Sequence, residues 1–259
     1  MDMLKAHWKL EWNAHRYIFF ATFLGWIICL LIGLFFKLGK GLSEPLMLET
    51  GMDGAVFVSG DSVFTALIEI VGSSWLLIWL VLLLAAARAG VYDEKRYLFF
   101  QTKTPIRKTL INKFLVAMME TTILTAGFLV ITISLAIVGG AETSLSTGLM
   151  MILETFLAIW LMTSSFICIF FIATALSMIP VGGYRFGFIA AIIYALIINE
   201  IQIQLGSNIL PEIGSKIYFH YTLFLSFHVT ILQAIFNLVM DILLFFIAIK
   251  ILNKSADLQ

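Results

Sequence analysis

Six stretches of the chain are continuously apolar over about 20 residues or more, which is the length of helix that crosses the hydrocarbon layer. They are residues 17–36, 64–87, 114–138, 147–178, 186–205 and 229–249. Inside that layer only helices and closed barrels satisfy every backbone polar group, and continuous rather than alternating apolar runs favour helices. The pattern therefore predicts an all-α polytopic membrane protein. It has one transmembrane domain over residues 1–259, and the fourth helix is long enough to tilt or to project beyond the bilayer.

The composition agrees with this pattern. Hydrophobic residues make up 61% of the chain and charged residues 12%, whereas a soluble domain is about half apolar and about a quarter charged. In water, a fold of this size would expose a large apolar surface at a cost in free energy. In lipid, the same surface carries no such cost. The formal net charge is zero, so the overall charge does not point to nucleic acid as a partner.

Lysine and arginine set the expected orientation. If both ends of the chain are cytoplasmic, 13 of the 16 basic residues fall on the cytoplasmic side, and only Lys37, Lys40 and Lys216 remain outside. Positive residues concentrate in cytoplasmic loops. The sequence thus predicts a multi-pass protein of the bacterial cytoplasmic (inner) membrane with both termini in the cytoplasm.

Residues 1–16, ahead of the first span, have their own pattern. Leu4, Trp8 and Trp12 recur at every fourth position, with basic residues such as Lys5 between them. This spacing is typical of an amphipathic helix that lies at the membrane surface with its tryptophans at headgroup depth. The alternative is a disordered tail that happens to contain two tryptophans.

The loop over residues 88–113 is the most charged part of the chain, and it also carries aromatic residues. Thr104 followed by Pro105 predicts the start of a new helix that runs into the third span, with a short separate helix before it. A solvated basic loop would explain the lysines but not the aromatic residues, whereas docking to a soluble partner would explain both. The residues expected to form this docking surface are Tyr92, Asp93, Glu94, Arg96, Tyr97, Phe99, Phe100, Lys103 and Arg107.

A second irregular segment, residues 206–228, precedes the last span. Gly206, Pro211 and Gly214 interrupt an otherwise apolar sequence. We expect short re-entrant or surface-lying helices here, on the outer side of the membrane.

Ionisable residues inside spans are costly, so each is a candidate functional residue. They are Glu69, Glu120, Glu154, Glu200 and Asp241. They could line a polar path that favours a cationic or amphipathic cargo. Alternatively, they could form hydrogen bonds between helices and hold the bundle together. The second interpretation is favoured for Glu69, Glu154 and Glu200, and more strongly for Asp241, because Gln233 and Asn237 lie on the same helix face as Asp241. No cysteine or histidine spacing indicates a metal site.

The order of these features resembles the permease subunits of type-2 ABC transporters. An amphipathic N-terminal helix, a long outer loop, a charged first cytoplasmic loop and a broken outer segment before the last span occur in the same sequence. In that family the first cytoplasmic loop reads approximately as an acidic residue and a few apolar residues, followed by the pattern T-x-P-x-[SR]-[RK]-x-x-[IL]-x-x-K. Residues 102–113 read Thr-Lys-Thr-Pro-Ile-Arg-Lys-Thr-Leu-Ile-Asn-Lys.

The resemblance implies a coupling helix within residues 92–101 that docks into a separate cytosolic ATPase. It also implies a complex of two ATPase subunits with this permease and a second permease copy or homologue. ATP and Mg²⁺ would be bound by the ATPase, since the chain contains no GxxxxGK[ST] phosphate loop and is not expected to be an enzyme. By analogy with peptide exporters and bacteriocin-immunity transporters, the cargo would be an amphipathic peptide, with lipid or drug export left open. The alternative function is a non-transporting membrane scaffold or sensor that binds a cytosolic partner through residues 88–113.

Overall fold

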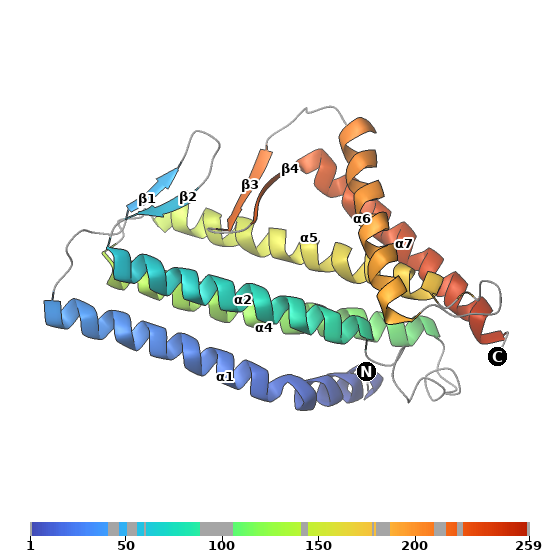
Figure 1. Ribbon diagram of the computed structural model, residues 1–259, viewed down its shortest axis with the longest axis horizontal. Coiled ribbons are helices and arrows are strands. Elements are labelled where there is room, and N and C mark those ends of the chain that lie inside the picture. The colour runs from blue at the N-terminus through green and yellow to red at the C-terminus, as the bar shows by residue number, and fades with distance from the viewer. Residues whose placement is uncertain are drawn as a thin grey trace.

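A computed structural model describes most of the chain. The described residues are 2–40, 47–50, 56–59, 61–88, 106–140, 145–177, 179, 187–209, 216–221 and 225–257. Six long helices account for most of them (Figure 1). Their bounds are α1 Asp2–Lys40, α2 Ser62–Arg88, α4 Ile106–Val138, α5 Leu145–Ser177, α6 Phe188–Ile209 and α7 Ile231–Asp257.

Each of the six helices is long and apolar enough to cross a membrane. The apolar spans within them are His15–Gly39, Ser62–Ala85, Arg107–Val138, Phe156–Ser177, Phe188–Gly206 and Leu232–Asn253. The prediction of a polytopic, six-helix membrane protein is confirmed to this extent. Helix α5 has 33 residues, which corresponds to about 50 Å at 1.5 Å per residue, so it extends past a hydrocarbon layer of about 30 Å.

The N-terminal segment and the first span form one continuous helix. Helix α1 runs from Asp2 to Lys40, and its apolar span begins only at His15. Trp8 and Trp12 stack with their ring centroids 5.5 Å apart, as expected for residues one helical turn apart. The helical prediction for residues 1–16 is therefore confirmed, but no break separates this segment from the span.

The helices form two groups that share α5. Helices α1, α2 and α4 pack against one another, whereas α6 and α7 pack mainly against α5. In Figure 1, α1, α2, α4 and α5 run side by side, α6 crosses them steeply, and α7 slants across the end of α5. Helix α5 also contacts α2 and α4, and α4 contacts α7 directly, so α5 is the main but not the sole connection between the two groups.

Two short antiparallel hairpins lie outside the helices. Strands β1 Met47–Thr50 and β2 Val56–Ser59 pair with Leu48 opposite Val58. Strands β3 Lys216–Tyr221 and β4 Leu225–Thr230 pair with Phe219 opposite Phe227.

The second hairpin corrects the expectation of short helices over residues 206–228. Helix α6 continues through Gly206 to Ile209, and the chain then forms strands. The β3 sequence, Lys-Ile-Tyr-Phe-His-Tyr, is rich in the β-branched and aromatic residues that favour strands. For the same reason the last helix begins at Ile231 and not at Val229, since Val229 belongs to β4.

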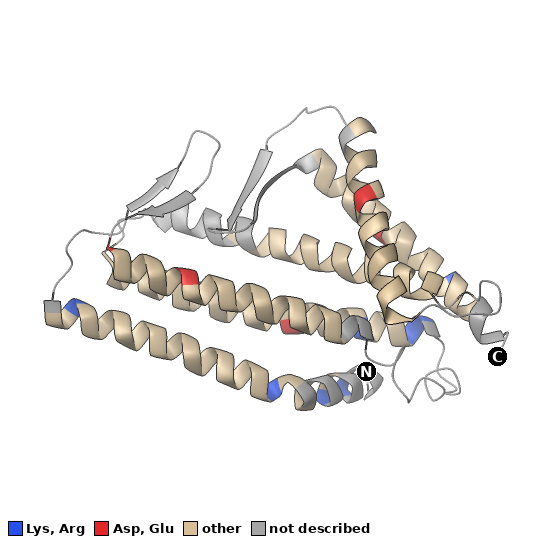
Figure 2. Ribbon diagram, in the orientation of Figure 1, with Lys and Arg blue, Asp and Glu red and all other residues tan. Residues whose placement is uncertain are grey.

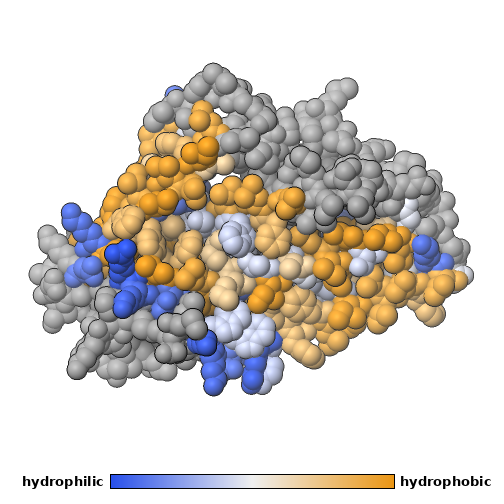
Figure 3. Space-filling model, turned by 180° about the vertical axis from the view of Figure 1, so that it is seen from behind, coloured by the Kyte–Doolittle hydropathy of each residue, from blue (hydrophilic) through white to orange (hydrophobic). Residues whose placement is uncertain are grey.

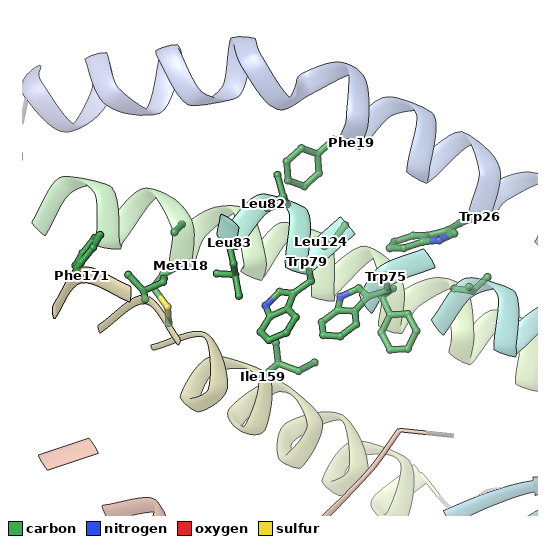
Figure 4. Packing of buried hydrophobic residues seen from close by; sticks show 14 of the residues in the cluster. Phe19, Trp26, Trp75, Trp79, Leu82, Leu83, Met118, Leu124, Ile159 and Phe171 are labelled. Carbon is green, nitrogen blue, oxygen red and sulfur yellow. The ribbon is translucent and has the colours of Figure 1, made fainter. Parts of the chain in front are cut away.

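Aromatic residues fill the centre of the α1, α2 and α4 group. In Figure 4, Trp75 and Trp79 point from α2 into the cluster, and Phe19 and Trp26 approach it from α1. Adjacent rings lie 4.7–6.3 Å apart in a continuous series that passes from α1 through α4 and α2 to α5: Phe19, Phe23, Trp26, Phe128, Trp75, Trp79, Phe166 and Phe170. Edge-on and offset ring pairs add stabilisation beyond the area they bury.

The exterior is apolar along the spans. Phe35, Leu38 and Ile189 are at least 75% exposed, and Figure 3 shows hydrophobic residues spread across the side of the bundle. Such a surface suits contact with lipid. Basic residues gather at the end of the bundle where α1 begins and α7 ends (Figure 2).

A glycine permits the closest helix contact in this group. A Cβ atom added at Gly127 of α4 would overlap the ring of Phe23 on α1, and that ring is held between Phe19 and Trp26. Small residues let helix backbones approach closely in membranes. The α1–α4 packing therefore depends on the absence of a side chain at position 127.

We predict that Gly127→Ala lowers the free energy of unfolding by about 1–3 kcal/mol, the usual cost of overpacking. Thermal unfolding of the purified protein in detergent would measure it. Gly25→Ala on α1 is the matched control, since an added Cβ there meets no described atom within 4 Å. Equal destabilisation by the two substitutions would contradict the packing argument.

Candidate functional site

Most of the predicted docking surface lies outside the described residues. This applies to Tyr92, Asp93, Glu94, Arg96, Tyr97, Phe99, Phe100 and Lys103. Arg107 is described, and it is exposed in the first turn of α4 beside the exposed Lys108. Helix α4 starts at Ile106, directly after Pro105, so the predicted helix start is confirmed. Lys113, two turns further along, is buried.

Glu120 is buried and paired with a histidine from another helix. Its two carboxylate oxygens lie 3.1 and 3.2 Å from Nδ1 of His15, and both side chains are almost fully buried. The ring N–H of His15 donates to the carboxylate and so links α1 to α4 where the first span begins. A carboxylate at this depth needs such a donor, because neither water nor lipid can supply one cheaply.

Three tryptophans form the same kind of interhelical hydrogen bond. The indole N–H groups of Trp26, Trp79 and Trp160 each donate to a serine or threonine hydroxyl on a neighbouring helix. The donor–acceptor pairs are Trp26 to Ser74 (2.7 Å), Trp79 to Thr163 (3.0 Å) and Trp160 to Thr122 (3.0 Å).

Each accepting hydroxyl is fixed by a second hydrogen bond. It donates in turn to the backbone carbonyl three or four residues earlier in its own helix, at 2.7–2.8 Å. The hydroxyl proton is thereby committed to the helix, and its lone pairs are left for the indole. These relays link α1 to α2, α2 to α5, and α5 to α4.

A cluster around Asp241 links α6 and α7 to each other and to α5. Ser165 of α5 donates to Oδ2 of Asp241 at 2.6 Å. Nε2 of Gln202 on α6 lies 3.4 Å from Oδ1 of Asp241 and 3.4 Å from Oδ1 of Asn237. Asp241 is 2% exposed and Gln202 5% exposed. The expectation that Asp241 makes interhelical contacts is confirmed.

The remaining intramembrane acids differ in environment. Glu69 on α2 is half-buried. Glu200 on α6 is exposed and accepts a hydrogen bond from Gln204 at 2.9 Å. The side chain of Glu154 lies outside the described residues. Glu69 and Glu200 thus lie on different helices and differ in exposure, and the buried Gln202 points to the opposite side of α6 from the exposed Glu200.

Several polar contacts were missed by sequence reasoning. The sequence places His15 at the end of the predicted surface helix. It also stands next to the first apolar residues of the span, and so it lies at the same depth as Glu120 of α4. The acceptors Ser74, Thr122 and Thr163 carry no distinctive local pattern. Only the helix pairing, which a single sequence does not give, identifies them.

Among the described residues, no group of three or more His, Cys, Asp or Glu side chains is placed to hold a metal ion. Comparison of the chain with protein-family models, with curated proteins and with solved structures finds no match in any of the three. Function is therefore argued from the residues themselves.

We predict that Thr163→Val lowers the free energy of unfolding by about 1–3 kcal/mol. The substitution keeps the shape of the side chain but leaves the buried indole N–H of Trp79 without an acceptor. Thr125→Val is the matched control, since the hydroxyl of Thr125 is fully buried and has no hydrogen-bond partner among the described residues. Thermal unfolding should show a neutral or stabilising effect for the control, and a similar result for Thr163→Val would refute the relay.

We also predict strong coupling between His15 and Glu120 in a double-mutant cycle. His15→Ala leaves a buried carboxylate without this donor, and we expect a loss of about 3 kcal/mol or more. The double mutant His15→Ala with Glu120→Ala should be less destabilised than the sum of the two single variants. Additive losses would show that the two side chains do not interact.

Proposed function

We propose that this polytopic membrane protein is the permease subunit of an ATP-driven ABC exporter of the bacterial inner membrane. It acts with a second permease copy or homologue and with two cytosolic ATPase subunits that bind ATP and Mg²⁺. The cargo is an amphipathic peptide. The observation that carries the proposal is the pattern of residues 102–113, joined to a helix that starts immediately after Pro105.

The length of the connection supports a role for this loop. Helix α2 ends at Arg88 and α4 starts at Ile106, and these two helices pack against each other. Packed helices are usually joined by about 2–8 residues. The connection over residues 89–105 is much longer than that, and long loops in compact domains commonly carry function.

The charges at this end of the bundle support a soluble, cytosolic partner. Arg107 and Lys108 are exposed where α4 begins. Lys5, Lys9 and Arg16 are exposed on the first turns of α1, and Figure 2 shows these basic positions at one end of the molecule. Together with the aromatic residues of the loop, they offer the mixture of charge and aromatic anchors that protein interfaces use.

The exposed polar residues of α6 support a pathway or a second permease beside it. Glu200 and Gln204 are exposed within an apolar span. A carboxylate facing hydrocarbon is costly, whereas one that faces a water-filled path or another polar chain is not. A pathway lined by such carboxylates would favour cationic or amphipathic cargo.

We predict that Tyr97→Ala with Phe99→Ala weakens ATPase binding at least about tenfold, because aromatic anchors dominate interface energies. Affinity purification from native membranes in mild detergent, followed by mass spectrometry, would measure this. A phosphate-loop ATPase should elute with the wild type at about one copy per permease chain. The same ATPase should be depleted from the double variant, and its ATP hydrolysis should no longer drive transport.

Phe20→Ala with Phe246→Ala is the matched control, since both rings are exposed on the spans. That variant should retain the ATPase. A well-preserved complex that lacks any ATPase would reject the exporter proposal and favour the scaffold or sensor alternative. Retention of the ATPase by the Tyr97/Phe99 variant would instead reject the assignment of the docking surface.

A further inference from the structure

Three cations share one face of helix α1 near its N-terminal end. Lys5, Lys9 and Arg16 are exposed. They follow one another at four and seven residues, so they lie within about 40° of one another around the helix axis. Among the side chains that the structure describes, no carboxylate forms an ion pair with any of the three. Figure 2 shows basic residues at this end of the bundle, and the face is open to an anion from outside the chain.

The same face continues along the span as an apolar surface. Phe20 follows Arg16 by four residues, and Ile27 follows Phe20 by seven, so the three lie on one side of α1. Phe20 is 70% exposed and Ile27 47%. A surface that is basic before the span and apolar within it matches the two parts of an anionic phospholipid, its headgroup and its acyl chains. A soluble partner would contact only the basic part.

Arg16 is oriented by its neighbour at the level where the span begins. Its Nη2 donates a hydrogen bond to the hydroxyl of Tyr17 at 3.0 Å, and its guanidinium carbon lies 4.8 Å from the centroid of the Tyr17 ring. The span starts at His15, so both side chains lie at the boundary between hydrocarbon and headgroups. The N–H donors of Arg16 that Tyr17 does not use can bind a phosphate through two parallel hydrogen bonds.

The two tryptophans of this segment pack toward the bundle. Trp8 stacks on Trp12, and Trp12 stacks on Phe19 with ring centroids 5.4 Å apart. Phe19 is 1% exposed and belongs to the hydrophobic core. This stacking fixes the rotation of α1, and it leaves the cations on the face that meets the membrane.

We propose that Arg16 and Tyr17 bind the headgroup phosphate of an anionic phospholipid such as phosphatidylglycerol. Lys9 supplies a second positive charge from about 10 Å further along the axis, because its flexible side chain can extend toward the headgroup. The acyl chains lie along Phe20 and Ile27.

The lipid site requires that α1 crosses a membrane, and it does not depend on the exporter proposal. It assigns the cations of α1 to lipid. The exposed Arg107 and Lys108 at the start of α4 remain for the loop over residues 89–105 and its soluble partner.

Native mass spectrometry of the full-length protein in detergent tests the proposal. The protein is titrated with phosphatidylglycerol or with phosphatidylcholine of the same acyl chains, and the affinity for each lipid is measured. We expect phosphatidylglycerol to bind at least about tenfold more tightly, because the cations attract its net negative charge. Lys9→Gln with Arg16→Gln should remove this preference. Arg107→Gln with Lys108→Gln is the matched control, since it removes the same charge from the same end of the bundle, and it should retain the preference.

Four outcomes overturn the proposal. One is equal affinity of the wild type for the two lipids. Another is equal loss of the preference in both double variants, which would mean a general attraction to the basic end. Displacement of phosphatidylglycerol by inorganic phosphate would mean a site for free anions. Loss of a soluble protein partner from the Lys9/Arg16 variant, with its lipid preference unchanged, would assign these cations to a protein interface.

Tyr17→Phe provides a second variant if the Lys9/Arg16 variant does not fold. It keeps the charge and the aromatic ring but removes the hydroxyl that accepts from Arg16. Binding of phosphatidylglycerol should weaken about threefold or more, while binding of phosphatidylcholine stays the same. Unchanged binding of phosphatidylglycerol by Tyr17→Phe would contradict the assignment of Arg16 and Tyr17 as the phosphate site.

Discussion

Inside the hydrocarbon of a bilayer, water cannot satisfy polar groups, and burying apolar side chains against one another gains little over burying them in lipid. Helices are then held by close packing and by hydrogen bonds between polar side chains. In this protein several pairs of neighbouring helices have such a bond. Indole–hydroxyl relays link α1 with α2, α2 with α5 and α5 with α4. His15 and Glu120 link α1 with α4, and the Asp241 cluster links α5, α6 and α7. The arrangement of the bundle depends on these few directional contacts.

The two parts of the bundle satisfy this requirement differently. In the α1, α2 and α4 group, the indole of Trp79 lies within a dense aromatic core and donates a short hydrogen bond to Thr163 of α5. Around Asp241 the hydrogen bond from Ser165 is short, at 2.6 Å, whereas the two contacts of Gln202 are 3.4 Å long.

The sequence was sufficient for the spans because a run of about 20 apolar residues has few structural alternatives. It was also sufficient for the start of α4, because Pro105 limits the positions at which a helix can begin. It failed at residues 216–230, where Gly and Pro suggested broken helices. There the strand preference of Ile217, Tyr218 and Phe219 decided the structure. The candidate acids were found because charge in a span is rare, but their partners were not. Serine and threonine are ordinary in membrane helices, and His15 becomes informative only when α1 and α4 are known to pack together.

Helix α5 is the main connection between the two groups of helices. Helices α6 and α7 contact each other little and are held mainly through α5, by small side chains such as Ala173 and Ala195 and by the bond from Ser165 to Asp241. Helix α5 in turn is bonded to α2 through Trp79 and Thr163 and to α4 through Trp160 and Thr122. These polar contacts therefore connect α6 and α7, through α5, to the two helices that flank residues 89–105.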